Sequence, residues 1–247
     1  MNIARAKHLI VLGLRRFGVV ATSLGSSPDG RIGKLLRFYE ISTVLDVGAN
    51  IGQYGRMLRR ELGFVGEILS FEPMSPEFQR LQQVTRGDSR WRAFNFGFGD
   101  RTSSMTINVA ANSASSSLLK RTHRLSRVAP ETEFVGKQEV QLRTVDDVYE
   151  EFGLSDQRVY LKIDAQGFEG KILKGAERAL GKIDAVQIEM PLQATYEGAL
   201  RFEEILQLLM EREYRLVHLV PGLFDKKTGE LLECDGIFYR HAGEAGI

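Results

Sequence analysis

The chain has 247 residues, of which 43% are hydrophobic and 26% are charged, and its formal net charge is +1. A chain of this length can bury the core of one enzyme-sized domain, and its composition is that of a folded globular protein. The near-neutral charge creates no strong field toward a polyanion, which argues against nucleic acid as a partner. The single cysteine, Cys234, excludes an internal disulfide and any site with two thiolate ligands, and it favours a reducing cytoplasm.

The start of the chain is predicted to form a basic helical arm. Residues 1–37 contain seven lysines and arginines against the single acidic residue Asp29. Apolar residues recur at helical spacing up to Phe17, the segment at Pro28 interrupts the pattern, and a second short helix is expected over 32–39. We interpret the arm as a helical cap with a solvated outer face; a lid over the substrate or an anchor on a membrane surface is the alternative.

Nothing in the sequence predicts insertion into a membrane. No stretch approaches the roughly 20 apolar residues that cross a bilayer. Arg15 and Arg16 interrupt the apolar segment that would have to serve as a secretory signal. We therefore expect a cytoplasmic protein whose arm makes at most a weak contact with a membrane surface.

Strand-like and helix-like segments alternate from Thr43 onward, which predicts parallel strands joined by crossover helices. The expected core strands are 43–47, 67–71, 92–96, 159–164, 185–189, 214–220 and 237–239, with two additional strands at 104–109 and 140–143. A long polar and basic loop over 111–127 is of a length that is more often functional than accidental. The pattern predicts an α/β fold with a doubly wound, seven-stranded, mostly parallel Rossmann-like sheet. One domain over 41–247 would form it, after the N-terminal arm 1–40.

Two glycines follow the first expected strand directly. Gly48 and Gly52 lie where this strand ends and a helix begins. Glycine permits a tight turn and the close approach of a ligand, and a helix N-terminus offers unpaired N–H groups to a carboxylate or phosphate. Since the ligand of an open parallel sheet lies beyond the carboxyl ends of the strands, this turn is predicted to bind a nucleotide-like cofactor.

The spacing distinguishes two classes of cofactor. A dinucleotide site requires G-x-G-x-x-G, whereas this chain has Asn50 and Gln53 where the further glycines would stand. Asp46 would repel a pyrophosphate but can accept hydrogen bonds from the ammonium group of a methionine tail, directly or through water. Glu72 ends the second strand, at the distance expected of a carboxylate that binds ribose hydroxyls. The pair favours S-adenosylmethionine over NAD; the alternative is that both acids are helix-capping or surface charges.

The motifs around these residues resemble those of the FkbM-family methyltransferases. The resemblance rests on Val44 to Tyr54, Phe71-Glu72-Pro73, Leu161 to Glu169, Leu173 to Ala176, Ile188-Glu189 and Asp235 to Phe238. It implies a class I methyltransferase fold and S-adenosylmethionine as the methyl donor. It also implies transfer to a hydroxyl oxygen of a sugar, a glycolipid or a secondary metabolite.

The resemblance also assigns cofactor contacts by position. Gly48, Asn50 and Gly52 would line the methionine end, Glu72 and Pro73 the ribose, and the segment from Asn95 through Gly97 to Asp100 the adenine, with Asp164 as a further contact. The chain departs from the pattern at Gln166, where many relatives have glutamate. A metal-binding or acid–base role that depends on a carboxylate at this position loses its support, and no metal is predicted.

Methyl transfer to a hydroxyl needs alignment, exclusion of water, and a base or electrostatic support as the proton leaves. Asp164 and Glu189, at the ends of the fourth and fifth core strands, are the best-placed carboxylates. Lys162 shares a face with Asp164 and could keep that carboxylate ionised or contact the acceptor. His218, near the end of the sixth strand, is a further candidate base with a pKa suited to neutral pH. A structural role is the commoner use of such a histidine.

The methyl acceptor has no decodable pattern in the sequence. We expect a small-molecule or glycan acceptor held by the arm, the loop 111–127 and the segment 191–198, and the protein could form a homodimer. Methylation of nitrogen on a small amine and a catalytically inactive cofactor-binding subunit are the alternatives. An NAD-dependent oxidoreductase is opposed by Asn50 and Gln53.

Overall fold

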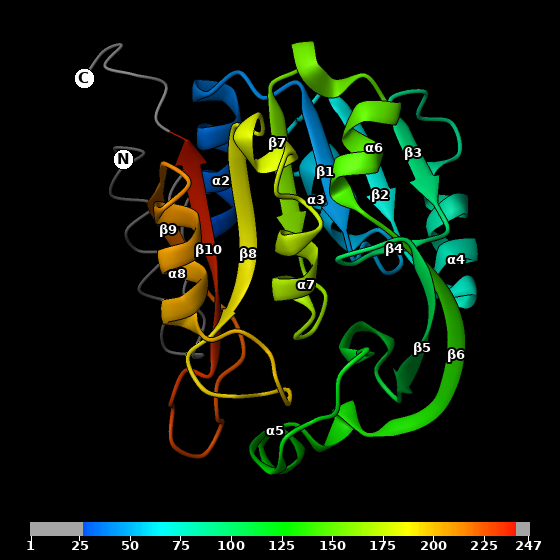
Figure 1. Cartoon of the computed structure of the whole chain (residues 1–247), viewed down its shortest axis with the longest axis vertical. Helices are drawn as coiled ribbons and strands as arrows, with labels where there is room; N and C mark the ends of the chain where they lie inside the picture. The colour runs from blue at the N-terminus through cyan, green and yellow to red at the C-terminus, as the bar shows by residue number, and fades with distance from the viewer. Residues whose placement is uncertain (1–26, 241–247) are drawn as a thin grey trace, which may run out of the picture.

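A seven-stranded sheet forms the centre of the protein, whose computed structural model describes residues 27–240 (Figure 1). Its strands are β1 (Thr43–Val47), β2 (Glu67–Phe71), β3 (Trp91–Phe94), β7 (Val159–Ile163), β8 (Ala185–Pro191), β9 (Tyr214–Pro221) and β10 (Glu233–Arg240). The strand order is β3-β2-β1-β7-β8-β10-β9, and β10 is antiparallel to both of its neighbours. The predicted mostly parallel, seven-stranded fold is confirmed.

Helices cover both faces of this sheet (Figure 1). They are α2 (Pro28–Phe38), α3 (Gln53–Arg60) and α4 (Ser75–Thr85) on one face, and α6 (Val145–Glu151), α7 (Glu169–Lys174) and α8 (Phe202–Met210) on the other. Because both faces are covered, every residue of β1 and β7 is buried. Parallel strands in such a sheet show near-continuous apolar runs instead of alternation. The predicted bounds of β1 match the structure, and β7 ends one residue earlier than predicted, at Ile163.

The strand order reverses between β1 and β7. From β1 the chain builds outward through β2 to β3, and it then returns to place β7 on the other side of β1. Val47 of β1 pairs with Phe71 of β2 and with Ile163 of β7. The carboxyl ends of the three strands therefore lie at the same edge, where open α/β sheets bind their ligands.

A second sheet lies beside the first and was not predicted as a unit. It has three strands in the order β4-β6-β5, namely β4 (Gly97–Phe98), β5 (Ser103–Ala110) and β6 (Phe134–Arg143). The sequence predicted β6 only from residue 140 onward, because its first half is mostly exposed and lacks apolar alternation. The expected loop 111–127 contains a short 3₁₀ turn, Ser113–Ser115, and most of α5 (His123–Val128). In Figure 1 this segment extends beyond the carboxyl ends of the central strands.

The end of the third strand needs correction. This strand ends at Phe94, two residues earlier than expected. The helix α4 begins at Ser75, and its N-cap is Met74. The capping acceptor is the Glu72 carboxylate, which accepts a hydrogen bond from the Met74 N–H at 2.8 Å.

Only the last part of the predicted arm lies within the described residues. There α2 packs on the central sheet, and Ile32 and Leu36 are buried in the same apolar cluster as Val44. The first predicted helix lies outside the described residues, and the boundary at residue 40 stays a prediction. Among the helices of residues 27–240, none is both long and apolar enough to cross a bilayer.

Candidate active site

A cavity of about 410 Å³ lies at the carboxyl ends of β1, β2 and β7, where the strand order reverses. This volume is within the range of small-molecule sites. Apolar side chains line one part, and all of them except Pro73 belong to one buried apolar cluster: Pro73, Met74, Phe98, Ile107, Leu142, Phe168 and Ile172. Polar side chains line another part and are linked to one another: Tyr54, Gln187 and Asp235 by hydrogen bonds, and Lys162, Asp164 and Gln166 likewise, with Lys162 over the Tyr54 ring. We call these two parts the apolar end and the charged end.

The turn after β1 lines the cavity. Gly48 has a φ of +75°, which glycine adopts at low cost. A Cβ at this position would lie 1.9 Å from the carbonyl oxygen of Asp164. Glycine is therefore required here by the close approach of the β7 end, a reason that the sequence alone did not reveal. Gly52, with a φ of +84°, faces Leu81 and Trp91 and does not line the cavity.

The N–H groups of residues 48–51, which precede the helix α3, are all paired within the protein. Gly48 and Ala49 donate their N–H groups to the Phe71 carbonyl at 3.1 and 3.0 Å. Asn50 donates to Glu72 at 2.8 Å, and Ile51 donates to the side-chain oxygen of Asn50. These four N–H groups are thus bonded to the end of β2, to the loop after it, or within the turn. The turn therefore contacts a ligand through its shape and not through free N–H donors at these positions.

Glu72 is held rigidly at the edge of the cavity. One carboxylate oxygen accepts from the Asn50 N–H and the other from the Met74 N–H, both at 2.8 Å. Burial raises the pKa of Glu72 to about 7, even though both hydrogen bonds favour the ionised form. Each oxygen retains a further lone pair, so the carboxylate can accept additional hydrogen bonds from a ligand.

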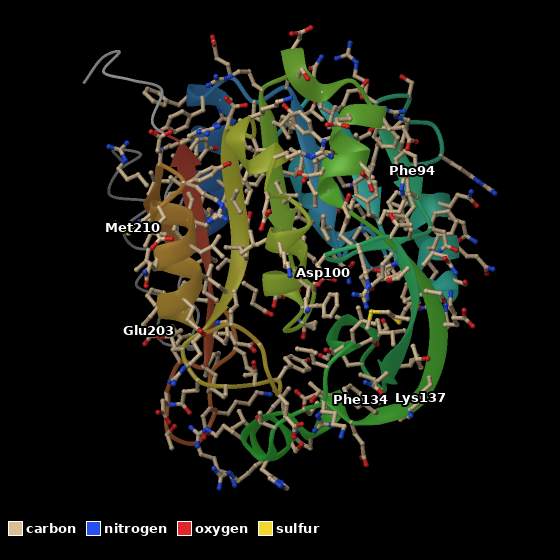
Figure 2. The ribbon with its side chains drawn as sticks, in the orientation of Figure 1. Phe94, Asp100, Phe134, Lys137, Glu203 and Met210 are labelled. Atoms are coloured by element: carbon tan, nitrogen blue, oxygen red, sulfur yellow. The ribbon has the colours of Figure 1, made fainter. Side chains whose placement is uncertain are left out.

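Of the segment 95–100 that was predicted to contact an adenine, Gly97 and Phe98 line the cavity. A Cβ at Gly97 would come within 3.1 Å of Leu142 and 3.3 Å of Pro73. Asn95 instead donates to the carbonyls of Glu72 and Pro73 and fixes their loop. Asp100 forms an ion pair with Lys171 at 3.0 Å, beside α7 and away from the cavity lining (Figure 2).

Asp46 is fully buried and does not line the cavity. Its Oδ2 accepts from the Ser70 hydroxyl at 2.9 Å, while its Oδ1 has no hydrogen-bond partner among the described residues. Lys162 Nζ lies 3.6 Å from that oxygen. Burial raises the pKa of Asp46, against the effect of Lys162 and Ser70. The predicted direct contact of Asp46 with a ligand therefore has no support in the geometry; Asp46 contacts Lys162, which does line the cavity.

Asp164 is the predicted catalytic carboxylate that faces the cavity. Its Oδ2 lies 3.3 Å from Lys162 Nζ, and its Oδ1 accepts from the Gln166 amide at 2.9 Å. Burial disfavours the charged form of Lys162, but Asp164, Asp46 and Asp235 together raise its pKa. Lys162 therefore stays a cation at neutral pH and serves to hold carboxylates, not to accept a proton.

The other two candidate bases do not line the cavity. Glu189 contacts the Gln166 amide at 3.3 Å, and burial together with nearby carboxylates raises its pKa well above the ordinary range. His218 lies on the edge strand β9, where burial and the charge of Arg31 lower its pKa. Glu189 thus lies one side chain away from the cavity, and His218 lies in a different part of the molecule.

Three polar residues of the cavity wall were not predicted. The hydroxyl of Tyr54 donates to the side-chain oxygen of Gln187 at 2.7 Å, and the Gln187 amide donates to Asp235 at 2.6 Å. Asp235 reaches the site because β10 is inserted antiparallel beside β8. Tyr54 and Asp235 belong to the motifs that carry the family resemblance, so a sequence signal was present. Neither motif indicates that both residues bond to Gln187.

A serine-rich segment covers the cavity. Ser113, Ala114 and Ser116 line it, and the Asn50 side chain donates to the Ser113 hydroxyl at 3.2 Å. The Ser117 hydroxyl donates to the Gln166 carbonyl at 2.6 Å. The predicted functional loop therefore contacts both the β1 turn and the β7 end. Across residues 27–240, no group of three or more His, Cys, Asp or Glu side chains is arranged to hold a metal ion.

Comparison with known proteins agrees with this architecture. Residues 46–216 match the methyltransferase FkbM domain. The 2-O-methyltransferase NoeI of Sinorhizobium fredii is 27% identical over 173 residues, which cover 67% of this chain and 70% of that protein.

Two solved structures are also similar. A methyltransferase FkbM from Methylobacillus flagellatus has a TM-score of 0.47 at 19% identity over 81% of this chain, and the chain spans only 44% of that protein. Aeropyrum pernix fibrillarin, solved with natively bound S-adenosyl-L-methionine, has a TM-score of 0.46 at 10% identity, with 80% and 66% of the two chains covered. Because the matched domain spans most of the sheet and the turn after β1, the chain belongs to the FkbM methyltransferase family.

Proposed function

We propose that the protein is an S-adenosylmethionine-dependent O-methyltransferase that acts on a hydroxyl of a sugar, a glycolipid or a secondary metabolite. The observation that carries this proposal is the cavity itself. It joins the turn at Gly48 and the carboxylate of Glu72 to the carboxylate of Asp164. A donor-binding surface and a proton acceptor thus share one cavity.

The residues present fit this donor. The apolar end of the cavity, with Pro73, Phe98 and Leu142, suits a flat adenine ring. Glu72 has the free lone pairs that ribose hydroxyls require. The charged end, with Asp164 and Asp235, suits a ligand that carries an ammonium and a sulfonium group. When bound, the donor supplies a methyl group on a positively charged sulfur.

The protein then has three tasks at the charged end. Asp164 accepts the proton of the acceptor hydroxyl, because it lines the cavity and is the predicted base with access to it. Lys162 holds this carboxylate in place through their ion pair. The serine-rich segment 113–117 covers the cavity and excludes water.

The name of the relative NoeI, a 2-O-methyltransferase, supports oxygen as the methyl acceptor. The carboxylates and amides around the charged end are also suited to a neutral, hydroxyl-rich acceptor, since sugar hydroxyls can donate to all of them. A cytoplasmic location and a homodimer remain predictions from the sequence.

Two measurements on the full chain test the proposal. Isothermal titration calorimetry with S-adenosylmethionine is expected to show one site, and Glu72→Ala is expected to weaken binding by at least about tenfold. Transfer of a labelled methyl group to a panel of neutral oligosaccharides and glycolipids tests the acceptor, and Asp164→Asn is expected to lower the rate by about 10²-fold or more. Absence of donor binding by the wild-type protein would overturn the assignment.

A further inference from the structure

Gln166 occupies a constrained position directly after β7. Its φ is +52°, which is uncommon for a residue other than glycine, and Gly167 follows with a φ of +97°. The Gln166 carbonyl accepts a hydrogen bond from the Ser117 hydroxyl at 2.6 Å. Such a conformation persists only when the surrounding structure fixes it. The fold therefore determines where the Gln166 side chain lies.

Tyr196 fixes the orientation of the Gln166 amide. The Tyr196 hydroxyl donates to Gln166 Oε1 at 2.9 Å, which directs Nε2 toward the carboxylates. Nε2 donates to Asp164 Oδ1 at 2.9 Å and lies 3.3 Å from the nearer oxygen of Glu189. Tyr196 is 2% exposed and packs on Gly167, where a Cβ would come within 2.7 Å of the tyrosine. The amide therefore has one arrangement that satisfies all three partners.

The surroundings of Glu189 are strongly acidic. The titratable groups that face it are Asp164 at the end of β7, Glu169 of α7, Glu233 and Asp235 of β10, and the hydroxyl of Tyr196. Lys162 is the nearby cation, and its ion pairs are with Asp46 and Asp164. Gln166 thus supplies hydrogen-bond donors between two carboxylates without adding a charge. A glutamate at this position would add a further negative charge instead.

We propose that Gln166 is a positioning residue for methyl transfer: its amide, held by Tyr196, joins Asp164 to Glu189 and holds the Asp164 carboxylate toward the cavity. The inference rests on the proposed function, in which Asp164 accepts a proton. Lys162 holds one oxygen of Asp164 and Gln166 holds the other, so both oxygens have a fixed partner. Loss of the amide would free one of them.

Carbon-13 NMR of the carboxyl groups tests the contact between Gln166 and Glu189 without a methyl donor or a methyl acceptor. The full chain, labelled at aspartate and glutamate, is titrated as wild type and as Gln166→Met and Gln166→Glu, with Glu189→Gln to assign the resonance. Both Gln166 variants are expected to raise the midpoint of Glu189 by about one pH unit, since one removes a donor and the other adds a charge. Two variants are used because Gln166→Glu adds a charge to a buried site.

Gln157→Glu is the matched control, because it makes the same change at an exposed position before the other end of β7. It is expected to leave the midpoint within about 0.2 pH units. A Glu189 midpoint that stays at the wild-type value in both folded Gln166 variants would overturn the proposal. A lower melting temperature without a change of midpoint would indicate a merely structural role, and it would overturn the proposal equally.

Calorimetry separates this inference from the function on which it rests. If the wild-type protein fails to bind S-adenosylmethionine, the proposed function is overturned and the role of Gln166 in transfer with it. If binding is normal and the midpoint does not move, only the role of Gln166 is overturned. With an acceptor from the oligosaccharide panel, Gln166→Met is expected to lower kcat by at least about tenfold and to leave the donor Kd within about twofold.

Discussion

The two ends of the cavity hold their carboxylates in different ways. At the donor end, Glu72 stands among apolar side chains and accepts two backbone N–H groups. At the other end, Asp164 belongs to a group of acids that share Lys162 and the amides of Gln166 and Gln187. The two backbone donors are fixed by the folds of the loops after β1 and β2, whereas side-chain donors can respond to charge. Under the proposed function, the Glu72 end binds the donor's ribose, and the Asp164 end meets the donor's cationic part and accepts the proton.

Replacement of Lys162 is expected to produce the largest loss of stability, because it removes the cation from the charged end of the cavity. Lys162→Met should destabilise the protein by about 3–5 kcal/mol, since Asp46 is then left buried and unpaired. This loss of unfolding free energy should be smaller at low pH. Burial raises the pKa of Asp46, so its carboxyl group is neutral at low pH, and the cost of burying its charge appears only as the pH rises through that pKa. Urea unfolding at pH 5.5 and pH 8 measures both effects.

Lys171→Met is the matched control, because the Lys171–Asp100 pair is more exposed. Its loss is expected to cost less than about 1 kcal/mol. Equal losses for the two lysine variants would contradict the view that the charged end depends on its buried cation.

Replacement of Gly48 tests the close contact between the turn after β1 and the end of β7. Gly48→Ala places a Cβ 1.9 Å from the Asp164 carbonyl, so one of the two loops must move. We expect the free energy of unfolding to fall by about 1–3 kcal/mol beyond the cost of the positive φ alone. We also expect the affinity for the donor to be at least about tenfold lower. Melting curves and calorimetry with S-adenosylhomocysteine are the measurements.

Gly63→Ala provides the comparison for that experiment. Gly63 also has a positive φ, at +65°, but a Cβ there meets nothing within 4 Å. This variant should show the cost of the backbone conformation, about 1–2 kcal/mol, with unchanged donor affinity. A Gly48→Ala protein that behaves like Gly63→Ala would show that the two loops are not held together at this point.

The smallest expected effect is the pH dependence of the donor end. The pKa of Glu72 is about 7, so the fraction of ionised carboxylate rises steeply between pH 6 and pH 8. If ribose hydroxyls bind the ionised form, affinity for S-adenosylhomocysteine should rise about tenfold over this range. The stability contribution of Glu72 has the opposite sign. Its pKa is raised on folding, so this contribution is present at low pH and is lost as the pH rises through 7.

Glu72→Gln is expected to abolish the pH dependence of binding while lowering affinity, because an amide cannot accept at both of its ends. Calorimetry at pH 6, 7 and 8 gives the comparison. An affinity of the wild-type protein that stays constant over this range would show that Glu72 does not bind the donor through its ionised form.

What the sequence determined by itself was local. The bounds of β1 and β2 followed from short, mostly apolar segments that alternate with helical ones, and the turn at Gly48 and the acids Glu72 and Asp164 followed from their places at strand ends. These features are contiguous in the chain, or they repeat the rule that parallel strands present their carboxyl ends at one edge. The parallel part of the sheet and the position of the cavity were therefore predictable.

Only the tertiary structure decided which of the predicted residues meet. Asp46 is fully buried and does not line the cavity. Nor is the cavity lined by Asn95, Asp100, Glu189 or His218. Strand position fixes the face on which a side chain lies but not its depth, or the neighbour that a distant loop brings to it. The contacts of Gln166 with Tyr196 and Glu189 join segments that are separate in the chain, and the antiparallel insertion of β10 adds Asp235. Packing creates such contacts, and no local pattern encodes them.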